Sequence, residues 1–241
     1  MIALLFLLLA LELVYIRFAD RYHIIDKPNQ RSSHFYITRR GGGIISPVAW
    51  ILFSIYQGLY LPWFTMGLIL ISTVSFMDDI KEVKVIPRIS IQVISFLLAF
   101  YDLGLFNILP LWLMLPILIF SIAALNAVNF MDGINGITGL YAFVFWMTLA
   151  FIESESGVTG IFHLTSPFPY MIFATLVFGY FNFRKRAICF AGDVGSVSMA
   201  YLMIGMVFFM MFRPQAGIIG RMDASPQAGL HFELKYLFHL F

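Results

Sequence analysis

The chain has 241 residues, of which 61% are hydrophobic and only 12% charged, and its mean hydropathy is +0.88. A soluble domain is roughly half apolar and about one quarter charged, so this composition excludes a soluble globule and predicts a protein whose solvent is largely lipid. The formal net charge is +2; the positions of the charges are more informative than their sum, and we expect no nucleic-acid partner.

Apolar runs fall near residues 2–19, 44–60, 63–77, 89–106, 110–125, 139–152, 167–183 and 194–212. Backbone groups in hydrocarbon must bond within their own segment, so the runs predict helices. The predicted fold is therefore all-α, a polytopic transmembrane bundle of about eight spans. We expect residues 1–212 to form this integral-membrane domain and residues 213–241 to form an atypical tail.

The first run has no basic residue before it, which favours a retained span over a cleaved signal peptide. Glu12 lies inside this run. A carboxylate at that depth is costly, so Glu12 is expected to face a neighbouring helix or to be protonated, and a structural role is the simpler interpretation.

Basic residues gather in loops on one predicted face. Twelve of the fifteen lie in loops 20–43, 78–88, 126–138 and 182–193 or, for Arg17, at their border. The positive-inside rule then places these loops in the cytoplasm and the N-terminus outside. Four aspartates fall at helix ends on the same face: Asp78, Asp79, Asp132 and Asp193. A transporter more often has ionisable groups near mid-membrane.

The first of these loops, residues 26–43, contains Arg31 and His34, and then Arg39 and Arg40 before three glycines. This pattern predicts a mobile flap that attracts phosphate. Positive charge that only sets the topology explains it equally well.

Asp78 and Asp79 are adjacent at the end of the third run. Neighbouring carboxylates repel, so either one takes up a proton or a cation compensates the pair. Mg²⁺ is a suitable cation because it prefers oxygen ligands and typically uses one or two carboxylates with substrate phosphates. A simple polar cap beside Lys81 and Lys84 is the alternative.

The segment 126–139, NAVNFMDGINGITG, is rich in amides and glycines. Asn126 and Asn129 would share a helical face if the fifth span continues through them, with amides able to contact a base or a sugar. Asp132 and Asn135 each precede a glycine, which indicates turns that let the backbone approach a ligand. A capped helix followed by a polar turn is the plainer interpretation.

A last motif, CFAGDVGSVSMA at 189–200, opens the eighth run. Asp193 lies between two glycines and before Ser196, which suits a helix N-terminus that binds phosphate and a carboxylate that binds a metal. Arg184 and Lys185, just upstream, can neutralise a polyphosphate or an anionic lipid. An ordinary helix cap explains the motif about as well.

Taken together, these motifs resemble those of the polyprenyl-phosphate N-acetylhexosamine-1-phosphate transferases. The resemblance rests on four motifs in family order: Asp26, Pro28, Asn29, Arg31 and His34 with the later Arg40-Gly-Gly; Asp78-Asp79 with Arg88 and Gln92; Asn126, Asn129, Asp132 and Gly136; and Gly192-Asp193 with Gly195-Ser196. It covers roughly residues 1–212.

The resemblance implies transfer of a sugar 1-phosphate from a UDP-N-acetylhexosamine to polyprenyl (undecaprenyl) phosphate, with release of UMP, in cell-envelope polysaccharide synthesis. It implies a multi-pass protein of the bacterial inner membrane whose active face is cytoplasmic, and it is compatible with a homodimer. The implied cofactor is Mg²⁺, with Mn²⁺ as an alternative, held by Asp193 and Asp78. The implied catalytic residues are Asp78, Asp79 and Asp132, and the implied substrate-binding residues are Arg31, His34, Arg88, Asn126, Asn129, Asn135, Arg184 and Lys185.

Two departures from the family pattern stand out. Asn135 replaces a second aspartate, and a histidine-rich motif expected after further spans has no counterpart in residues 213–241. We therefore expect a C-terminally truncated member, and a catalytically inactive protein that binds membrane or lipid is the alternative function. The acetamido sugar, and the choice between direct transfer and a covalent intermediate, stay open.

Overall fold

The computed structural model describes residues 1–26, 37–132, 134–155 and 163–212, and these are almost entirely helical. In chain order the elements are α1 (Ile2–Tyr22), β1 (Ile25–Asp26), β2 (Thr38–Arg39), the 3-10 turn η1 (Gly42–Ile44), α2 (Ile45–Tyr56), α3 (Pro62–Ile80), α4 (Val85–Asp102), α5 (Leu105–Ile108), α6 (Leu111–Met131), α7 (Ile137–Glu155), α8 (Phe168–Asn182) and α9 (Gly192–Phe212). The two short strands pair antiparallel, Ile25 opposite Arg39 and Asp26 opposite Thr38. The prediction of an all-α polytopic bundle is confirmed.

Each of the eight predicted apolar runs contains a helix, but the helices fall into two length classes. Six of those described, α1, α3, α4, α6, α7 and α9, are 18–21 residues long and apolar enough to cross a membrane. The other two, α2 with η1 and α8, are apolar but shorter. A perpendicular span needs about 20 residues, so the prediction of eight spans counted two helices that are too short for a perpendicular crossing.

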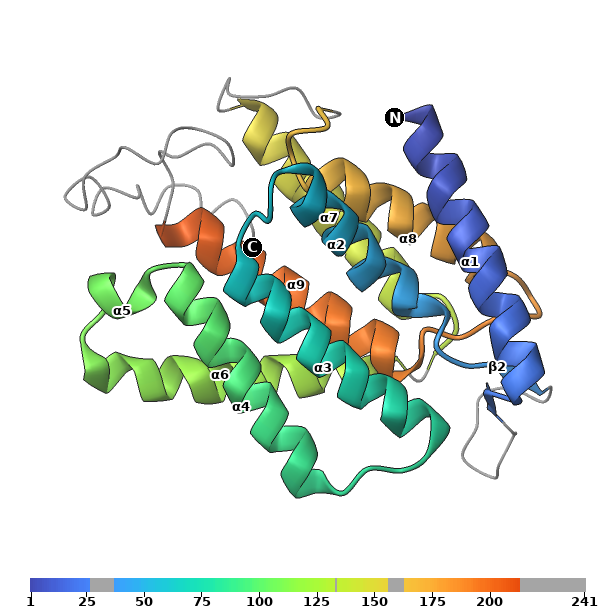
Figure 1. Ribbon diagram of the computed structural model, residues 1–241, viewed down its shortest axis with the longest axis horizontal. Coiled ribbons are helices and arrows are strands. Elements are labelled where there is room, and N and C mark those ends of the chain that lie inside the picture. Colours follow the sequence, from blue (N-terminus) through green and yellow to red (C-terminus); the bar gives the residue numbers. More distant parts are fainter. Residues whose placement is uncertain (27–36, 133, 156–162, 213–241) are drawn as a thin grey trace.

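The helix α9 runs through the middle of the bundle, and the other helices surround it (Figure 1). On one side α9 contacts α3 and α6, and on the other it contacts α2 and α7. Most of α8 is also buried in the interior of the bundle, where it packs against α1, α2 and α7. By contrast, α6 is peripheral and exposes Trp112 and Phe120, as expected for a helix that faces lipid.

Aromatic side chains join the central helices. Tyr201 of α9 stacks on Phe64 of α3, with ring centroids 4.8 Å apart. Its hydroxyl donates to the carbonyl oxygens of Phe64 (3.1 Å) and of Ser95 in α4 (3.0 Å). Trp50 of α2 donates its indole N–H to the hydroxyl of Thr65 at 2.9 Å. Buried Tyr and Trp side chains need such partners, so these contacts fix how α2, α3, α4 and α9 pack.

The polar motifs lie at one end of this bundle. The C-terminal ends of α1, α3 and α6 meet the N-terminal end of α9 there, on the side of Figure 1 where β2 lies. Glu12, farther up α1, is fully buried, and its Oε1 lies 3.7 Å from the Cys189 Sγ. Glu12 was expected to face a neighbouring helix or to be protonated; in the structure it is buried against the segment that precedes α9.

Candidate active site

A strap, residues 39–43, crosses the start of α9. The N–H of Phe190 donates to the Arg39 carbonyl at 2.8 Å, and that of Gly42 donates to the Phe190 carbonyl at 2.8 Å. The approach is so close that a Cβ on Gly43 would lie 2.4 Å from the Gly195 Cα. Only glycine fits there. In the structure Arg39 and Arg40 are bonded to carboxylates, Arg31 and His34 lie outside the described residues, and the mobile flap stays a prediction.

Arg40 extends from this strap and bridges two acidic motifs. Its Nε lies 2.7 Å from Asp79 Oδ1, and its Nη2 lies 3.0 Å from Asp193 Oδ1. The backbone is held as well, because the Tyr15 hydroxyl donates to the Arg40 carbonyl at 2.6 Å. Partial burial opposes the charge, but the two carboxylates outweigh it and raise the pKa of Arg40.

Asp79 caps α9 from the end of α3. Its buried carboxylate accepts the backbone N–H groups of Asp193 at 2.8 Å and of Val194 at 3.0 Å. A negative charge at a helix N-terminus satisfies free N–H groups and is favoured by the helix dipole. With Arg40 as its third partner, Asp79 has both oxygens engaged. This arrangement suits a positioning residue.

Asp78 has a different environment from its neighbour. Its carboxylate accepts the Val83 N–H and the Arg88 guanidinium, the latter at 3.2 Å. It also contacts the carboxyl group of Asp193. Two carboxyl groups in contact require a shared proton or a cation between them. Arg88, predicted to bind substrate, thus holds Asp78 in the structure.

The amides of α6 lie in the wall of the same site. The predicted continuation of this helix through Asn126 and Asn129 is confirmed. Asn126 pairs with the Gln92 amide of α4, its Nδ2 donating to Gln92 Oε1 at 3.0 Å. Asn129 accepts the Ser196 hydroxyl at 2.6 Å and so joins α6 to α9.

Asp132 immediately follows α6. Burial raises its pKa to about 7; a hydrogen bond with Thr138 and the charge of Arg40 oppose the rise, and the negative charge of Asp193 adds to it. Asn129, three residues earlier, bonds to Ser196 of α9, so Asp132 lies at the same end of the bundle as Asp193. The structure thus brings all four predicted aspartates to one end of the bundle.

Asn135, Arg184 and Lys185 lie at the exposed edge of this end. The Asn135 amide donates to the Arg184 carbonyl at 3.0 Å, and the Arg184 guanidinium stacks on the Tyr180 ring, 4.6 Å from its centroid. Asn135 and Arg184 therefore contact each other, and no bond joins either of them to the four aspartates in the described part of the chain.

A divalent ion fits this chemistry only with help from substrate. Across residues 1–26, 37–132, 134–155 and 163–212, no group of three acidic, histidine or cysteine side chains is arranged to hold a metal. Mg²⁺ needs only one or two carboxylates when substrate phosphates and waters complete its shell. Asp78 and Asp193 contact each other and could supply two such carboxylates, each of which also contacts one arginine, Arg88 and Arg40 respectively.

Comparison with known proteins identifies the family of this chain. The family model for glycosyl transferase family 4 matches residues 61–211, which include Asp78, Asp79, Asp132 and Asp193. The chain belongs to this family. The resemblance drawn from the motifs is confirmed at family level, and Arg40 lies outside the segment matched by the family model.

A curated relative from Bacillus subtilis (strain 168) is described as a probable undecaprenyl-phosphate N-acetylglucosaminyl 1-phosphate transferase. It is 27% identical to this family 4 chain over 207 residues, which cover 77% of this chain and 55% of the relative. The chain thus spans about half the length of that protein.

Sequence reasoning overlooked three groups that hold the site together. Arg40 was expected only as part of a flap that attracts phosphate, Gln92 was part of a recognised motif without a role, and Tyr15 received no attention. The glycines after Arg40 were the available signal, because three in succession indicate a backbone that must approach another element closely.

Proposed function

We propose that this protein transfers a sugar 1-phosphate from a UDP-N-acetylhexosamine to polyprenyl phosphate and releases UMP. The observation that carries the proposal is the meeting of Asp78, Asp79, Asp132 and Asp193 around Arg40 at one end of a membrane bundle. A water-soluble nucleotide and a lipid headgroup can meet at such an end. Family membership and the printed activity of the B. subtilis relative support the same reaction class.

In direct transfer, an oxygen of the lipid phosphate forms a bond to the phosphorus atom that carries the sugar. The bond from that phosphorus to the bridging oxygen breaks, and the electron pair leaves with UMP. Enzymes accelerate such transfers mainly by positioning the reactants and by stabilising charge on the phosphates. A cluster that combines carboxylates, a guanidinium and a helix N-terminus suits both tasks.

The roles follow from what each side chain touches. Asp78 and Asp193 would hold Mg²⁺, or Mn²⁺ in its place, which would neutralise phosphate charge when bound. Arg88 fixes the direction of Asp78. Asp79 positions Arg40 and α9, because both of its oxygens are engaged. Asp132 is the remaining candidate to exchange a proton with substrate or to contact the nucleotide.

The amide and basic groups have complementary roles in this proposal. Asn126 and Asn129, in the wall formed by α6, would contact nucleotide or sugar, with Asn135 at the margin. Arg184 and Lys185 lie exposed beside the site, where they can attract the diphosphate. Arg31 and His34 keep their predicted substrate-binding roles.

We place the site on the cytoplasmic face of a bacterial inner membrane, with the N-terminus outside. The excess of basic residues in the loops at this end supports that orientation. A homodimer is compatible with the proposal but is not needed for it.

The test is UMP release by purified protein supplied with polyprenyl phosphate, Mg²⁺ and each UDP-N-acetylhexosamine in turn. We expect one sugar nucleotide to yield UMP and lipid-linked sugar in equal amounts, dependent on a divalent ion. If none reacts at saturating Mg²⁺, the enzymatic proposal fails and the non-catalytic lipid-binding alternative is favoured. The orientation is tested separately, by labelling single cysteines at exposed positions with a membrane-impermeant reagent.

A further inference from the structure

The two carboxylates that Arg40 bridges hold it in unequal ways. Asp79 has a fully buried side chain and also accepts two backbone N–H groups of α9, so both of its oxygens are engaged within the protein. The Asp193 side chain is 19% exposed, and its carboxylate contacts Arg40 and the carboxyl group of Asp78. Arg40 therefore has one enclosed partner and one partner that a solute can reach.

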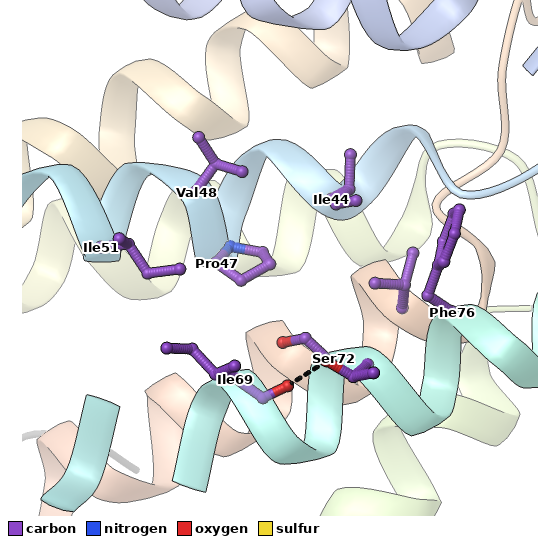
Figure 2. Close-up of a pocket in the computed structure, with 9 residues that line it drawn as sticks. Ile44, Pro47, Val48, Ile51, Ile69, Ser72 and Phe76 are labelled. Atoms are coloured by element: carbon purple, nitrogen blue, oxygen red, sulfur yellow. Dashed lines mark hydrogen bonds between the residues drawn. The ribbon is translucent and has the colours of Figure 1, made fainter. Parts of the chain in front are cut away.

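The enclosed partner, Asp79, lies beside apolar side chains. Figure 2 shows Ile44 and Phe76 at one end of an apolar groove between α2 and α3, and Val194 also lines this groove. Val194 donates its backbone N–H to Asp79 at 3.0 Å, and Phe76 lies three residues before Asp79 on α3. A guanidinium that left Asp79 would strand a buried charge in these surroundings, which is strongly unfavourable. The bond between Arg40 and Asp79 is therefore the permanent one.

The exposed partner, Asp193, is needed by two cations. It is one of the two carboxylates proposed to hold Mg²⁺, and the Arg40 Nη2 lies 3.0 Å from its Oδ1. Two cations on one carboxylate repel each other, and this repulsion is stronger in a partly buried site than in water. A divalent ion therefore binds Asp193 in competition with Arg40.

Arg88, the cation on the other metal carboxylate, is less able to yield its place. It donates to Asp78 at 3.2 Å, and its buried Nε has no hydrogen-bond partner among the described residues. If Arg88 left Asp78, a guanidinium whose side chain is only 25% exposed would lose its carboxylate, which is costly. Arg40 keeps a carboxylate in either case, because Asp79 holds its Nε at 2.7 Å.

We infer that Arg40 is an exchangeable counter-ion of Asp193: a divalent ion displaces its Nη2, while its Nε stays on Asp79. The inference rests on the proposed function, because that proposal assigns the ion to Asp78 and Asp193. Binding of the ion then costs an ion pair, so two carboxylates alone bind it weakly and the phosphates of the substrate are needed to complete its shell. Arg40 thereby couples tight binding of the metal to arrival of the sugar nucleotide.

Chemical labelling tests the exchange without catalysis. Phenylglyoxal modifies accessible guanidinium groups, and fragment ions in mass spectrometry distinguish Arg40 from Arg39 in the purified protein. The two side chains form a matched pair, because each is 33% exposed and bonded to a carboxylate. We expect Mg²⁺ to raise the modification rate of Arg40 about tenfold, on the scale of losing one charge-assisted hydrogen bond, and to leave the rate of Arg39 unchanged.

The control for this labelling is Asp193→Asn, in which Mg²⁺ should change neither rate. A rate of Arg40 modification that Mg²⁺ leaves unchanged or lowers in the parent would overturn the inference, because the guanidinium would then stay on Asp193 beside the ion.

The affinity for the ion gives a second test. Arg40→Lys keeps a charge for Asp79 but replaces the planar fork that reaches two carboxylates by a single ammonium group, and Arg39→Lys is the matched control. Binding of Mn²⁺ without substrate is measured by EPR. We expect Arg40→Lys to lower the Kd for Mn²⁺ about three- to tenfold and Arg39→Lys to match the parent. An unchanged or higher Kd in Arg40→Lys would show that Arg40 does not compete with the ion.

These tests and the UMP assay fail independently of each other. If Mg²⁺ speeds the labelling of Arg40 in a protein that releases no UMP, the proposed activity fails and the counter-ion role stands. If UMP is released while the labelling of Arg40 does not respond to Mg²⁺, the proposed function stands and this inference is overturned.

Discussion

The site has two parts that are held in different ways, the junction of the strap with α3 and α9 and the amide segment that ends α6. At the junction, Arg40 and Asp79 join the strap, α3 and α9, and Arg40 lies 153 positions before its partner Asp193. The guanidinium of Arg40 lies within 3.0 Å of both carboxylates, and Asp79 also accepts the backbone N–H of Asp193. In the amide segment, Asn126 and Asn129 each make neutral hydrogen bonds to a neighbouring helix. The motif richest in polar residues, 126–139, therefore only lines the site. Arg40, which lies outside that motif, holds the segments of the site together.

The two parts should differ in energy as well. Breaking a buried charge pair strands the remaining charge and typically costs about 3–5 kcal/mol. A neutral hydrogen bond between membrane helices contributes about 0.6 kcal/mol on average, and an unsatisfied buried partner adds about 1–3 kcal/mol. Substitutions at the junction should therefore affect both stability and turnover more than substitutions in the wall.

Arg40→Ala should have the largest effect. It leaves the buried Asp79 without its cation, and we expect the free energy of unfolding in detergent to fall by about 3–5 kcal/mol, with loss of turnover. Arg39→Ala is the matched control, because Arg39 pairs with the half-exposed Asp20 at the surface and should cost about 0–1 kcal/mol. Equal destabilisation by the two variants would show that the junction is no stronger than a surface pair.

Asp193→Asn comes next and affects chemistry more than folding. The backbone N–H of residue 193 still donates to Asp79, and the amide oxygen can still accept from Arg40, so the bundle should stay folded. We expect UMP release to fall about 10²- to 10³-fold, on the scale of removing one group that stabilises transition-state charge. The control Asp20→Asn should leave turnover unchanged. Parent-level activity in Asp193→Asn would remove this residue from the metal site.

Within the wall, Asn126→Ala should have a moderate effect and Asn135→Ala almost none. Asn126 bonds to the buried Gln92 and to the Ile122 carbonyl, so its loss should cost about 1–2 kcal/mol of unfolding free energy. Asn135 is exposed and donates one bond to the Arg184 carbonyl. Thermal unfolding in the same detergent compares the two. The reverse order of stabilities would contradict the placement of Asn126 in the wall.

The fold was predictable because it follows from local composition. Apolar runs in lipid must be helices, and each predicted run contains a helix. Runs such as 44–60 and 167–183 were already shorter in the sequence than the roughly 20 residues of a perpendicular span. Gln57 and Gly58 end α2 in the structure before Pro62 starts α3.

The site was predictable in its residues but not in its contacts. The positions of Asp78, Asp79, Asp132 and Asp193 at helix ends on one face were sufficient to expect their convergence. Arg40 and Asp79 are 39 positions apart in the sequence, and nothing local indicates that one carboxylate caps a helix that starts 113 positions later. Such contacts depend on how α3 and α9 pack, which in turn depends on aromatic groups such as Tyr201 and Phe64.

The smallest predicted effect concerns Asp132 and its dependence on pH. Burial raises the pKa of this carboxyl from 3.8 to about 7, so the folded protein binds the proton more tightly than the unfolded chain. Stability contributed by this group is therefore lost as the pH rises from about 4 through 7. Asp132→Asn stays neutral and avoids that loss. With a chelator present, the variant should gain at least about 1 kcal/mol relative to the parent between pH 5 and pH 8, because the folded carboxyl keeps its proton over pH values at which the unfolded chain has lost it, at about 1.4 kcal/mol per pH unit. If the parent instead becomes the more stable of the two at pH 8, Asp132 is ionised and paired in the folded protein, and its environment resembles that of Asp79 at the junction.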